Sequence, residues 1–217
     1  MTDVKQEELF DIYDDNLEKI GVKPRSQVHR DGDWHRSFHC NVIYRDAQGK
    51  DWMVLQKRAP DKDTFPNCFD VACGGHYSAG EDLETTALRE LDEELGLKVA
   101  FSNLIFVGIR ISMKKPSATT IDREVNDIFF LVNDQPLTAY QPNDELSGLA
   151  LIPIDDGLAL CAGERQDIDA IYLPRGVTQM QAIKIGMDDY VATFDQYLYR
   201  VLVSAKRCLN GEKYLVI

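Results

Sequence analysis

The sequence GGHYSAGEDLETTALRELDEELGL, residues 74–97, decides the fold. Leucine and alanine recur every three or four positions through residues 82–95, and this spacing predicts an amphipathic helix with one apolar stripe. Gly96 follows at the position where a glycine commonly ends a helix. The paired glycines Gly74 and Gly75 close a short apolar run, VACGG, that predicts a strand. We therefore expect a strand, a loop and a helix in direct succession.

Three glutamates of the expected helix project from one side of it. Glu90, Glu93 and Glu94 stand at positions i, i+3 and i+4, which are neighbours on a helix surface. Like charges on one face repel each other, and a hard divalent cation with oxygen ligands, such as Mg²⁺, compensates them. A solvated helix face gives the same bare pattern. We also expect Arg89 to pair with Glu81 and to brace the helix against the preceding loop.

The complete spacing of this segment resembles the Nudix box, GX5EX7REUXEEXGU, in which U is an apolar residue. Gly75, Glu81, Arg89 and Glu90 stand at fixed positions of the box, and the other positions also match. The resemblance implies an α/β fold, namely an α/β/α sandwich with a mixed β-sheet. It also implies that Mg²⁺ or Mn²⁺ polarises phosphoryl oxygens and activates water, so that a diphosphate linked to another group, X, is cleaved. The implied metal ligands are Glu90, Glu93, Glu94 and the carbonyl group of Gly74.

The flanking residues, roughly 9–155, carry a second resemblance. The segments KPRSQVHRDGDWHRSFH (23–39) and LQKRAPDKDTFPNCFDVACGGH (55–76) look like the isopentenyl diphosphate isomerase branch of the Nudix family. That branch has a histidine-rich metal site beside a diphosphate-binding group. The metal ligands implied here are His29, His35, His76, Asp122 and Glu124, with Asp122 standing where the branch has glutamate. The implied diphosphate ligands are Arg25, Arg58 and Lys62.

The role of the histidines remains open at this point between metal binding and structure. Neutral imidazoles suit Zn²⁺ or Mn²⁺ better than Mg²⁺, so metal binding here predicts a second ion, a transition metal. His39 lies outside the matched set and is expected to be structural.

Two departures from the isomerase pattern favour hydrolysis. The isomerase has a cysteine, its proton-transfer acid, immediately before a glycine–histidine pair, and Gly74 stands at that position here. Cys73 lies one residue earlier, which on a strand turns a side chain to the other face, so we expect a buried thiol. The isomerase also has a basic residue where Glu90 stands. We therefore predict hydrolysis of a phosphoanhydride bond in a small organic or nucleoside diphosphate. The alternatives are an isopentenyl diphosphate delta-isomerase and a non-catalytic diphosphate-binding module.

Hydrolysis needs a general base that takes a proton from the attacking water. Glu145, in QPNDELSG, lies on a Pro- and Gly-containing loop that could close over substrate, and we predict it as the base. The alternatives are Glu124, on a predicted strand, and the box glutamates Glu93 and Glu94.

Composition excludes several classes of partner. The chain of 217 residues carries a formal charge of −12, and a nucleic-acid polymer requires a basic face, so we expect no such partner. No apolar run approaches the roughly 20 residues that span a bilayer, and the N-terminal residues lack a secretory signal. We therefore expect no membrane association and a cytoplasmic location. The expected partner is a small-molecule diphosphate, and a homodimer remains open.

A single Nudix domain is expected over residues 1–217. Its expected parts are an N-terminal strand and loop (1–34), a Nudix core (35–155) and a helical C-terminal extension (156–217). Residues 14–34 are expected to form a long loop, and helical spacing in 188–208 predicts a helix packed on the core. Strands are predicted at 9–13, 37–46, 51–59, 103–113, 123–134 and 148–154.

Overall fold

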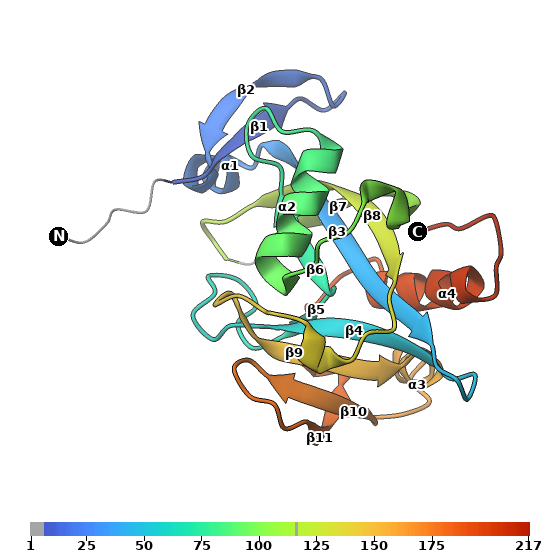
Figure 1. Cartoon of the computed structure of the whole chain (residues 1–217). Coiled ribbons are helices and arrows are strands. Elements are labelled where there is room, and N and C mark those ends of the chain that lie inside the picture. Colours follow the sequence, from blue (N-terminus) through green and yellow to red (C-terminus); the bar gives the residue numbers. More distant parts are fainter. Residues whose placement is uncertain (1–6, 116) are drawn as a thin grey trace.

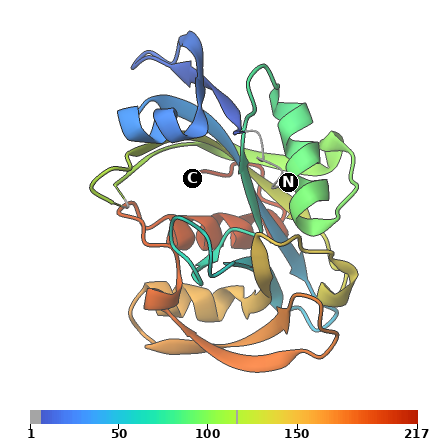
Figure 2. The same ribbon diagram turned by 90° about the vertical axis from the view of Figure 1, so that its left-hand side faces the viewer.

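The computed structural model describes residues 7–115 and 117–217, in which a mixed β-sheet lies between two layers of helices (Figure 1). Helix α2 (Leu83–Leu95) packs on one face of the sheet. Helices α3 (Ile154–Cys161) and α4 (Tyr197–Leu209) pack on the other face. Figure 2 shows α2 in green and α4 in red on opposite sides of the sheet. The architecture is the predicted α/β/α sandwich.

The strands follow the order β11-β10-β9-β4-β3-β1-β2. Strand β8 also pairs with β3, and β7 pairs with β8. Short strands β5 and β6 pair with β4 and β3. Their bounds are β1 Leu9–Tyr13, β2 Lys19–Pro24, β3 Trp34–Arg45, β4 Asp51–Arg58, β5 Phe69–Asp70, β6 Cys73–His76, β7 Leu104–Lys114, β8 Asp122–Val132, β9 Leu146–Pro153, β10 Asp167–Pro174 and β11 Gln181–Gly186.

Strand β3 positions the elements that carry the predicted site residues. Ser37 on β3 is the register partner of His76 on β6 and of Asn126 on β8, so β6 and β8 flank β3 on opposite edges. The β3–β8 pair is parallel, whereas β6 and β4 run antiparallel to β3, which makes the sheet mixed. Residues that face each other in register place their side chains on the same side of a sheet. Strands β6, β3, β8 and β7 therefore present rows of adjacent side chains on each face.

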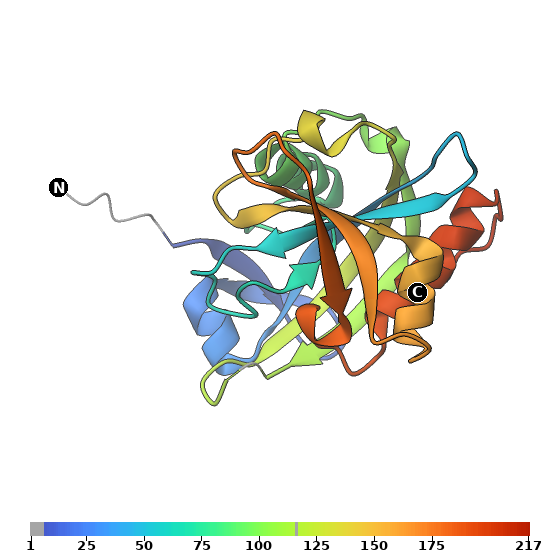
Figure 3. The same ribbon diagram turned by 90° about the horizontal axis from the view of Figure 1, so that it is seen from below.

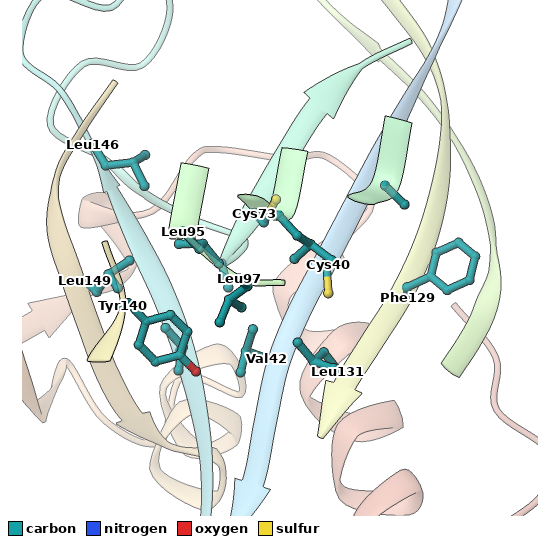
Figure 4. Packing of buried hydrophobic residues seen from close by; sticks show 14 of the residues in the cluster. Cys40, Val42, Cys73, Leu95, Leu97, Phe129, Leu131, Tyr140, Leu146 and Leu149 are labelled. Atoms are coloured by element: carbon teal, nitrogen blue, oxygen red, sulfur yellow. The ribbon is translucent and has the colours of Figure 1, made fainter. Parts of the chain in front are cut away.

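Helix α2 forms as its sequence predicts. The Asp82 side chain accepts a hydrogen bond of 2.8 Å from the Thr85 amide and so caps the first turn. Gly96 ends the helix with φ of 67°, a left-handed conformation that glycine adopts without strain. The stripe of Ala87, Leu91 and Leu95 is fully buried. Figure 4 shows the core beneath this helix, where Leu95 lies near Cys73, Leu97 and Val42.

All seven predicted strands are present, with ends that differ by at most a few residues, and the VACGG run corresponds to β6. The 37–46 and 51–59 runs form the expected antiparallel hairpin β3–β4. The expectation of a long loop at 14–34 is wrong, because β2 and helix α1 (Arg25–Asp31) lie within it. Helix α1 spans only seven residues and buries only Val28, so no apolar period appears in its sequence. The first six residues of the expected N-terminal part lie outside the described residues.

The C-terminal extension is helical only in part, which corrects the prediction. Strands β10 and β11 (orange in Figure 3) continue the sheet beyond β9, and β10 buries Ile168 and Ala170 against α3 and α4. The predicted 188–208 helix begins only at Tyr197, since Gln196 adopts a left-handed conformation with φ of 53°. The sequence DIDAIYLP of β10 carries apolar residues at alternate positions, and antiparallel pairing with β9 and β11 makes it a strand. None of the helices described here is long and apolar enough to cross a membrane.

Candidate active site

The box glutamates take unequal positions on α2. Glu90 and Glu94 turn toward β6 and are 8% and 5% exposed, whereas the Glu93 side chain is 58% exposed. The Gly74 amide donates a hydrogen bond of 2.9 Å to Glu94 Oε2. A Cβ atom on Gly75 would lie 2.0 Å from the carboxyl carbon of Glu90, so any side chain there would displace this carboxylate. Glu90 and Glu94 thus form a carboxylate pair against the glycine backbone of β6.

Burial controls the protonation of this pair. It raises the pKa of Glu90 to about 7, although the neighbouring Arg89 guanidinium opposes the shift. Burial raises the pKa of Glu94 to about 8, and the charge of Glu90 adds to that shift. Two buried carboxyl groups held side by side are an oxygen donor set of the kind that Mg²⁺ and Mn²⁺ prefer. The residues present therefore fit a divalent cation.

Arg89 ties α2 to the loop before it and to β6. Its guanidinium donates to Glu81 at 2.8 and 3.0 Å, which confirms the predicted brace. It also donates to Glu90 at 2.8 Å and to Glu93 at 3.2 Å. A further hydrogen bond of 3.0 Å reaches the carbonyl oxygen of His76. Arg89 thereby fixes the carboxylates relative to the strand that carries His76.

The fold assembles a histidine cluster from four separate elements. Helix α1 supplies one histidine, β3 and β6 one each, and β8 two carboxylates, which together are His29, His35, His76, Asp122 and Glu124. The ligand nitrogens of the three histidines lie within 4.8 Å of one another, and so do the ligand atoms of His35 and the two carboxylates. His35 Nε2 lies 3.5 Å from Asp122, and His76 Nε2 lies 3.5 Å from Glu124. The structure therefore brings together all five residues that the isomerase resemblance named.

Unpartnered atoms converge in this cluster. His29 Nε2, His35 Nε2 and Asp122 Oδ1 are buried and have no hydrogen-bond partner among residues 7–115 and 117–217. Burial lowers the pKa of His29 to about 4 and that of His76 to about 3, so both imidazoles are neutral near pH 7. Neutral imidazole is the form that binds a metal. The donor set fits a transition metal, and a bound ion would satisfy the three orphaned atoms.

The carboxylates of the cluster have opposed pKa shifts. Burial, with the charge of Glu124 in addition, raises the pKa of Asp122 to about 7. Burial also acts to raise the pKa of Glu124, but Lys114 and His76 outweigh it and hold that pKa well below its ordinary value. Lys114 Nζ lies 3.4 Å from Glu124 Oε2. Glu124 therefore favours its charged form, in contrast to Asp122.

Strand β6 joins the carboxylate pair to the histidine cluster. Gly75 faces α2 and packs against Glu90, and the next residue, His76, faces the opposite side of the sheet toward Glu124. The two candidate metal sites are thus separated by one strand.

The predicted phosphate ligands Arg25 and Arg58 border the histidine cluster, and both lower the pKa of Asp122 against the dominant effect of burial. The guanidinium of Arg25 lies 5.8 Å above the Phe10 ring, and that ring stacks on His35 and His76. Arg58 donates to the carbonyl oxygen of Thr64 at 2.8 Å.

Glu145 and Lys62 form an ion pair with each other. The loop of Glu145 is attached to helix α2, because the Gln141 and Asn143 amides donate to the carbonyl oxygens of Leu95 and Glu94 at 2.9 and 3.3 Å. After burial and Glu90, the charge of Glu145 is a further cause of the raised pKa of Glu94. The predicted base and one predicted phosphate ligand therefore lie close to the box.

The sequence model of the NUDIX domain matches residues 33–171, which include the box and most of the histidine cluster. The chain belongs to the Nudix family. Nudix enzymes generally use divalent metals such as Mg²⁺ or Mn²⁺ and act on small molecules, and the histidine and carboxylate groups of the cluster could hold a metal ion.

Relatives of this Nudix chain support the same assignment. An uncharacterized Nudix hydrolase of Clostridium acetobutylicum is 41% identical over 152 residues, which are 70% of this chain and 72% of that protein. Nudix hydrolase 3 of Arabidopsis thaliana is 35% identical over 217 residues, 96% of this chain but only 26% of the longer plant protein. Relatives named isopentenyl-diphosphate Delta-isomerase also match, one from Clavibacter michiganensis subsp. michiganensis at 31% identity over 131 residues, 60% of this chain and 65% of that protein.

Solved structures confirm the fold. A NUDIX hydrolase from Alicyclobacillus acidocaldarius superimposes with a TM-score of 0.54 over 85% of this chain and 98% of that chain, at 17% identity. At this identity the likeness extends to the fold alone.

Sequence reasoning missed Lys114 and Ser112, which contact Glu124 from β7 at 3.4 and 3.3 Å. The signal was present, because residues 110, 112 and 114 alternate onto the face that carries Glu124. The expectation for Cys73 is confirmed, since the thiol is fully buried in the core beneath α2 and burial raises its pKa well above the ordinary value.

Proposed function

We propose that this Nudix chain hydrolyses a phosphoanhydride bond in a small organic or nucleoside diphosphate, with Mg²⁺ or Mn²⁺ bound at the box. The observation that carries the proposal is the buried pair Glu90 and Glu94 against Gly74 and Gly75. Holding two carboxylates in this position lowers stability unless a cation neutralises them. The proposed ligands are Glu90, Glu93, Glu94 and the carbonyl group of Gly74.

When bound, the cation polarises phosphoryl oxygens and lowers the pKa of a water molecule. Arg25, Arg58 and Lys62 hold the diphosphate through charge-assisted hydrogen bonds. Glu145 takes the proton from the attacking water, and its contact with Lys62 supports its place beside the phosphates. Glu124 and the box glutamates remain the alternative bases.

The histidine cluster holds a second ion, and Zn²⁺ or Mn²⁺ suits its imidazoles. Its charge lies one strand away from the box, on the side where Arg25 and Arg58 approach Asp122.

Isomerisation is the second candidate, and the histidine cluster together with the isomerase-named relatives favours it. Gly74 argues against it, because this position offers no side chain to act as an acid. Deuterium exchange into isopentenyl diphosphate, followed by NMR in D₂O, tests it, and turnover there would replace hydrolysis as the conclusion. A non-catalytic binding module is the third candidate, and it has no need for the buried carboxylate pair.

A panel of diphosphates with Mg²⁺ or Mn²⁺, assayed for released phosphate, tests the proposal. Glu93→Gln should lower kcat by about two or more orders of magnitude. The protein should stay folded, since substitutions on an exposed helix surface usually cost under about 0.5 kcal/mol. Asp92→Asn is the matched control, because Asp92 is the adjacent exposed carboxylate and lies outside the box ligands. Equal turnover by both variants would refute metal binding by Glu93.

A further inference from the structure

The sheet face opposite α2 is polar next to the histidine cluster. Alternate residues of β3, β8 and β7 place buried polar side chains there in adjacent rows, and we call this set the polar floor: Ser37, His39, Asn126, Arg110 and Ser112. Each of the five residues is at most 9% exposed. Ser37 and Arg110 are the register partners of Asn126 on its two sides, so the floor crosses three strands without a gap.

One side-chain atom of the polar floor, Asn126 Oδ1, has no partner among the described residues. Two and four residues beyond Asn126 on the same strand, Ile128 and Phe130 make this face apolar where it packs against α4. Asn126 donates to Ser37 Oγ at 2.6 Å, but its Oδ1 atom is buried without a hydrogen-bond partner in the described part of the chain. A buried polar atom without a partner lowers stability. A hydrogen-bond donor on a bound ligand would satisfy this atom.

The C-terminal extension holds the floor in place. Asp195 accepts two hydrogen bonds from Arg110, at 2.7 and 2.9 Å. The guanidinium carbon of Arg110 lies 4.0 Å from the centre of the Tyr197 ring, and the hydroxyl of Tyr197 lies 3.1 Å from His39 Nδ1. Arg110 and His39 are therefore fixed in orientation before any ligand binds, which reduces the entropy that binding costs.

The floor is continuous with both candidate metal sites. Ser112 donates to Glu124 at 3.3 Å, and Ser37 is the register partner of His76. The Gly74 amide donates a hydrogen bond to Glu94 of the box. A Cβ atom at Gly74 would lie 3.3 Å from the ring of His39 in the floor. A diphosphate held at the metal sites would thus extend its organic group over the floor.

We propose that the polar floor binds the group X of the diphosphate substrate and selects an X that forms hydrogen bonds, such as a sugar, over a hydrocarbon. The inference rests on the proposed function and adds the chemical class of the substrate. A site that hydrogen-bonds its ligand rejects an analogue without hydroxyl groups, because the buried polar atoms are then left unpaired. The proposal also gives Asp195 and Tyr197 a role, because they fix the orientation of Arg110 and His39 in the floor.

The test compares two diphosphates of five carbon atoms, ribose 5-diphosphate and n-pentyl diphosphate, in the presence of Mg²⁺. The wild-type chain should show a kcat/KM for the ribose compound at least about 100-fold higher than for the pentyl compound. Asn126→Leu should reduce this ratio at least about tenfold by slowing the ribose reaction alone. Gln56→Leu is the matched control, because Gln56 is a buried amide with an unpartnered Oε1 atom on the α2 face. It should leave the ratio unchanged.

Equal or faster hydrolysis of the pentyl compound by the wild-type chain would overturn the inference. An unchanged ratio in Asn126→Leu, or an equal loss in Gln56→Leu, would overturn it as well. If neither compound is cleaved, the proposed function fails for this class, and calorimetric dissociation constants of the same two compounds still decide the inference. If circular dichroism shows that Asn126→Leu is unfolded, Asn126→Ala removes the same amide without added bulk and takes its place.

Discussion

Gly75→Ala should leave the protein folded but displace Glu90 of the box, so that activity is lost while stability is largely kept. The new Cβ atom would lie 2.0 Å from the carboxyl carbon of Glu90 and 2.1 Å from its Oε1 atom. Carbon atoms pack at about 3.5 Å or more, so the carboxylate must move by about 1.5 Å. It is the far end of a flexible side chain, so the cost in stability should be at the low end of overpacking, about 1 kcal/mol.

The same displacement is large compared with the needs of metal coordination. Mg²⁺ holds its oxygen ligands at about 2.0–2.1 Å, so a shift of about 1.5 Å removes Glu90 from the site. A misplacement of about 1 Å can lower a rate about 100-fold, and we expect at least that loss in kcat/KM for the best diphosphate of the panel.

The assay pairs released phosphate with thermal unfolding. Gly21→Ala is the control, because a Cβ atom on Gly21 would meet its nearest neighbour, Ile12, at 3.7 Å, an ordinary contact. The control should keep both activity and stability. Wild-type kcat/KM in a folded Gly75→Ala variant would refute the view that Gly75 keeps Glu90 in place for a cation. A fully unfolded variant would instead show that the glycine serves packing first.

Three further outcomes follow from the site. Mass spectrometry should find a transition metal in the wild-type protein and none in His35→Ala. An unchanged metal content in the variant would show that the histidines have a structural role. Glu145→Gln should remove the acidic limb of the kcat–pH profile while metal affinity stays near wild type, whereas Glu124→Gln should lose metal affinity first; an intact limb in Glu145→Gln passes the role to Glu124. Folding raises the pKa of Glu90 to about 7 and of Glu94 to about 8, so in the metal-free protein their contribution to stability is complete below pH 4.5 and is lost as the pH rises through 7 to 8. Bound Mg²⁺ needs the charged carboxylates, so its increase in Tm should be larger at pH 9 than at pH 6, and equal shifts would contradict this pairing.

Local sequence determined the helix, its ends and the strands that flank it. Ala87, Leu91 and Leu95 make one stripe, Asp82 caps it and Gly96 ends it, and each of these is a property of neighbours within a few turns. The spacing of the Nudix box is also a local feature, because the helix period and the glycine turn both depend on residues close in sequence. These predictions held because no distant contact competes with them.

The N-terminal and C-terminal parts could not be predicted in the same way. Helix α1 has only one buried side chain, Val28, so no period is visible in its sequence. Strand β11 is mostly exposed and exists through its pairing with β10. The left-handed Gln196 sets the start of α4, and no apolar pattern marks it. In each case tertiary contacts override weak local preferences.

The sequence by itself determined the family and named the candidate site residues, because a family pattern specifies residue types at fixed spacings. Only the tertiary structure decided how they meet. His29, His35 and His76 come from three elements, and their convergence depends on β6 and β8 flanking β3. It also decided that Glu93 is exposed while Glu94 is buried, which helical spacing alone leaves equal. The physical reason is that burial, and with it every pKa shift at the site, is a property of the packed sheet and is absent from any isolated segment.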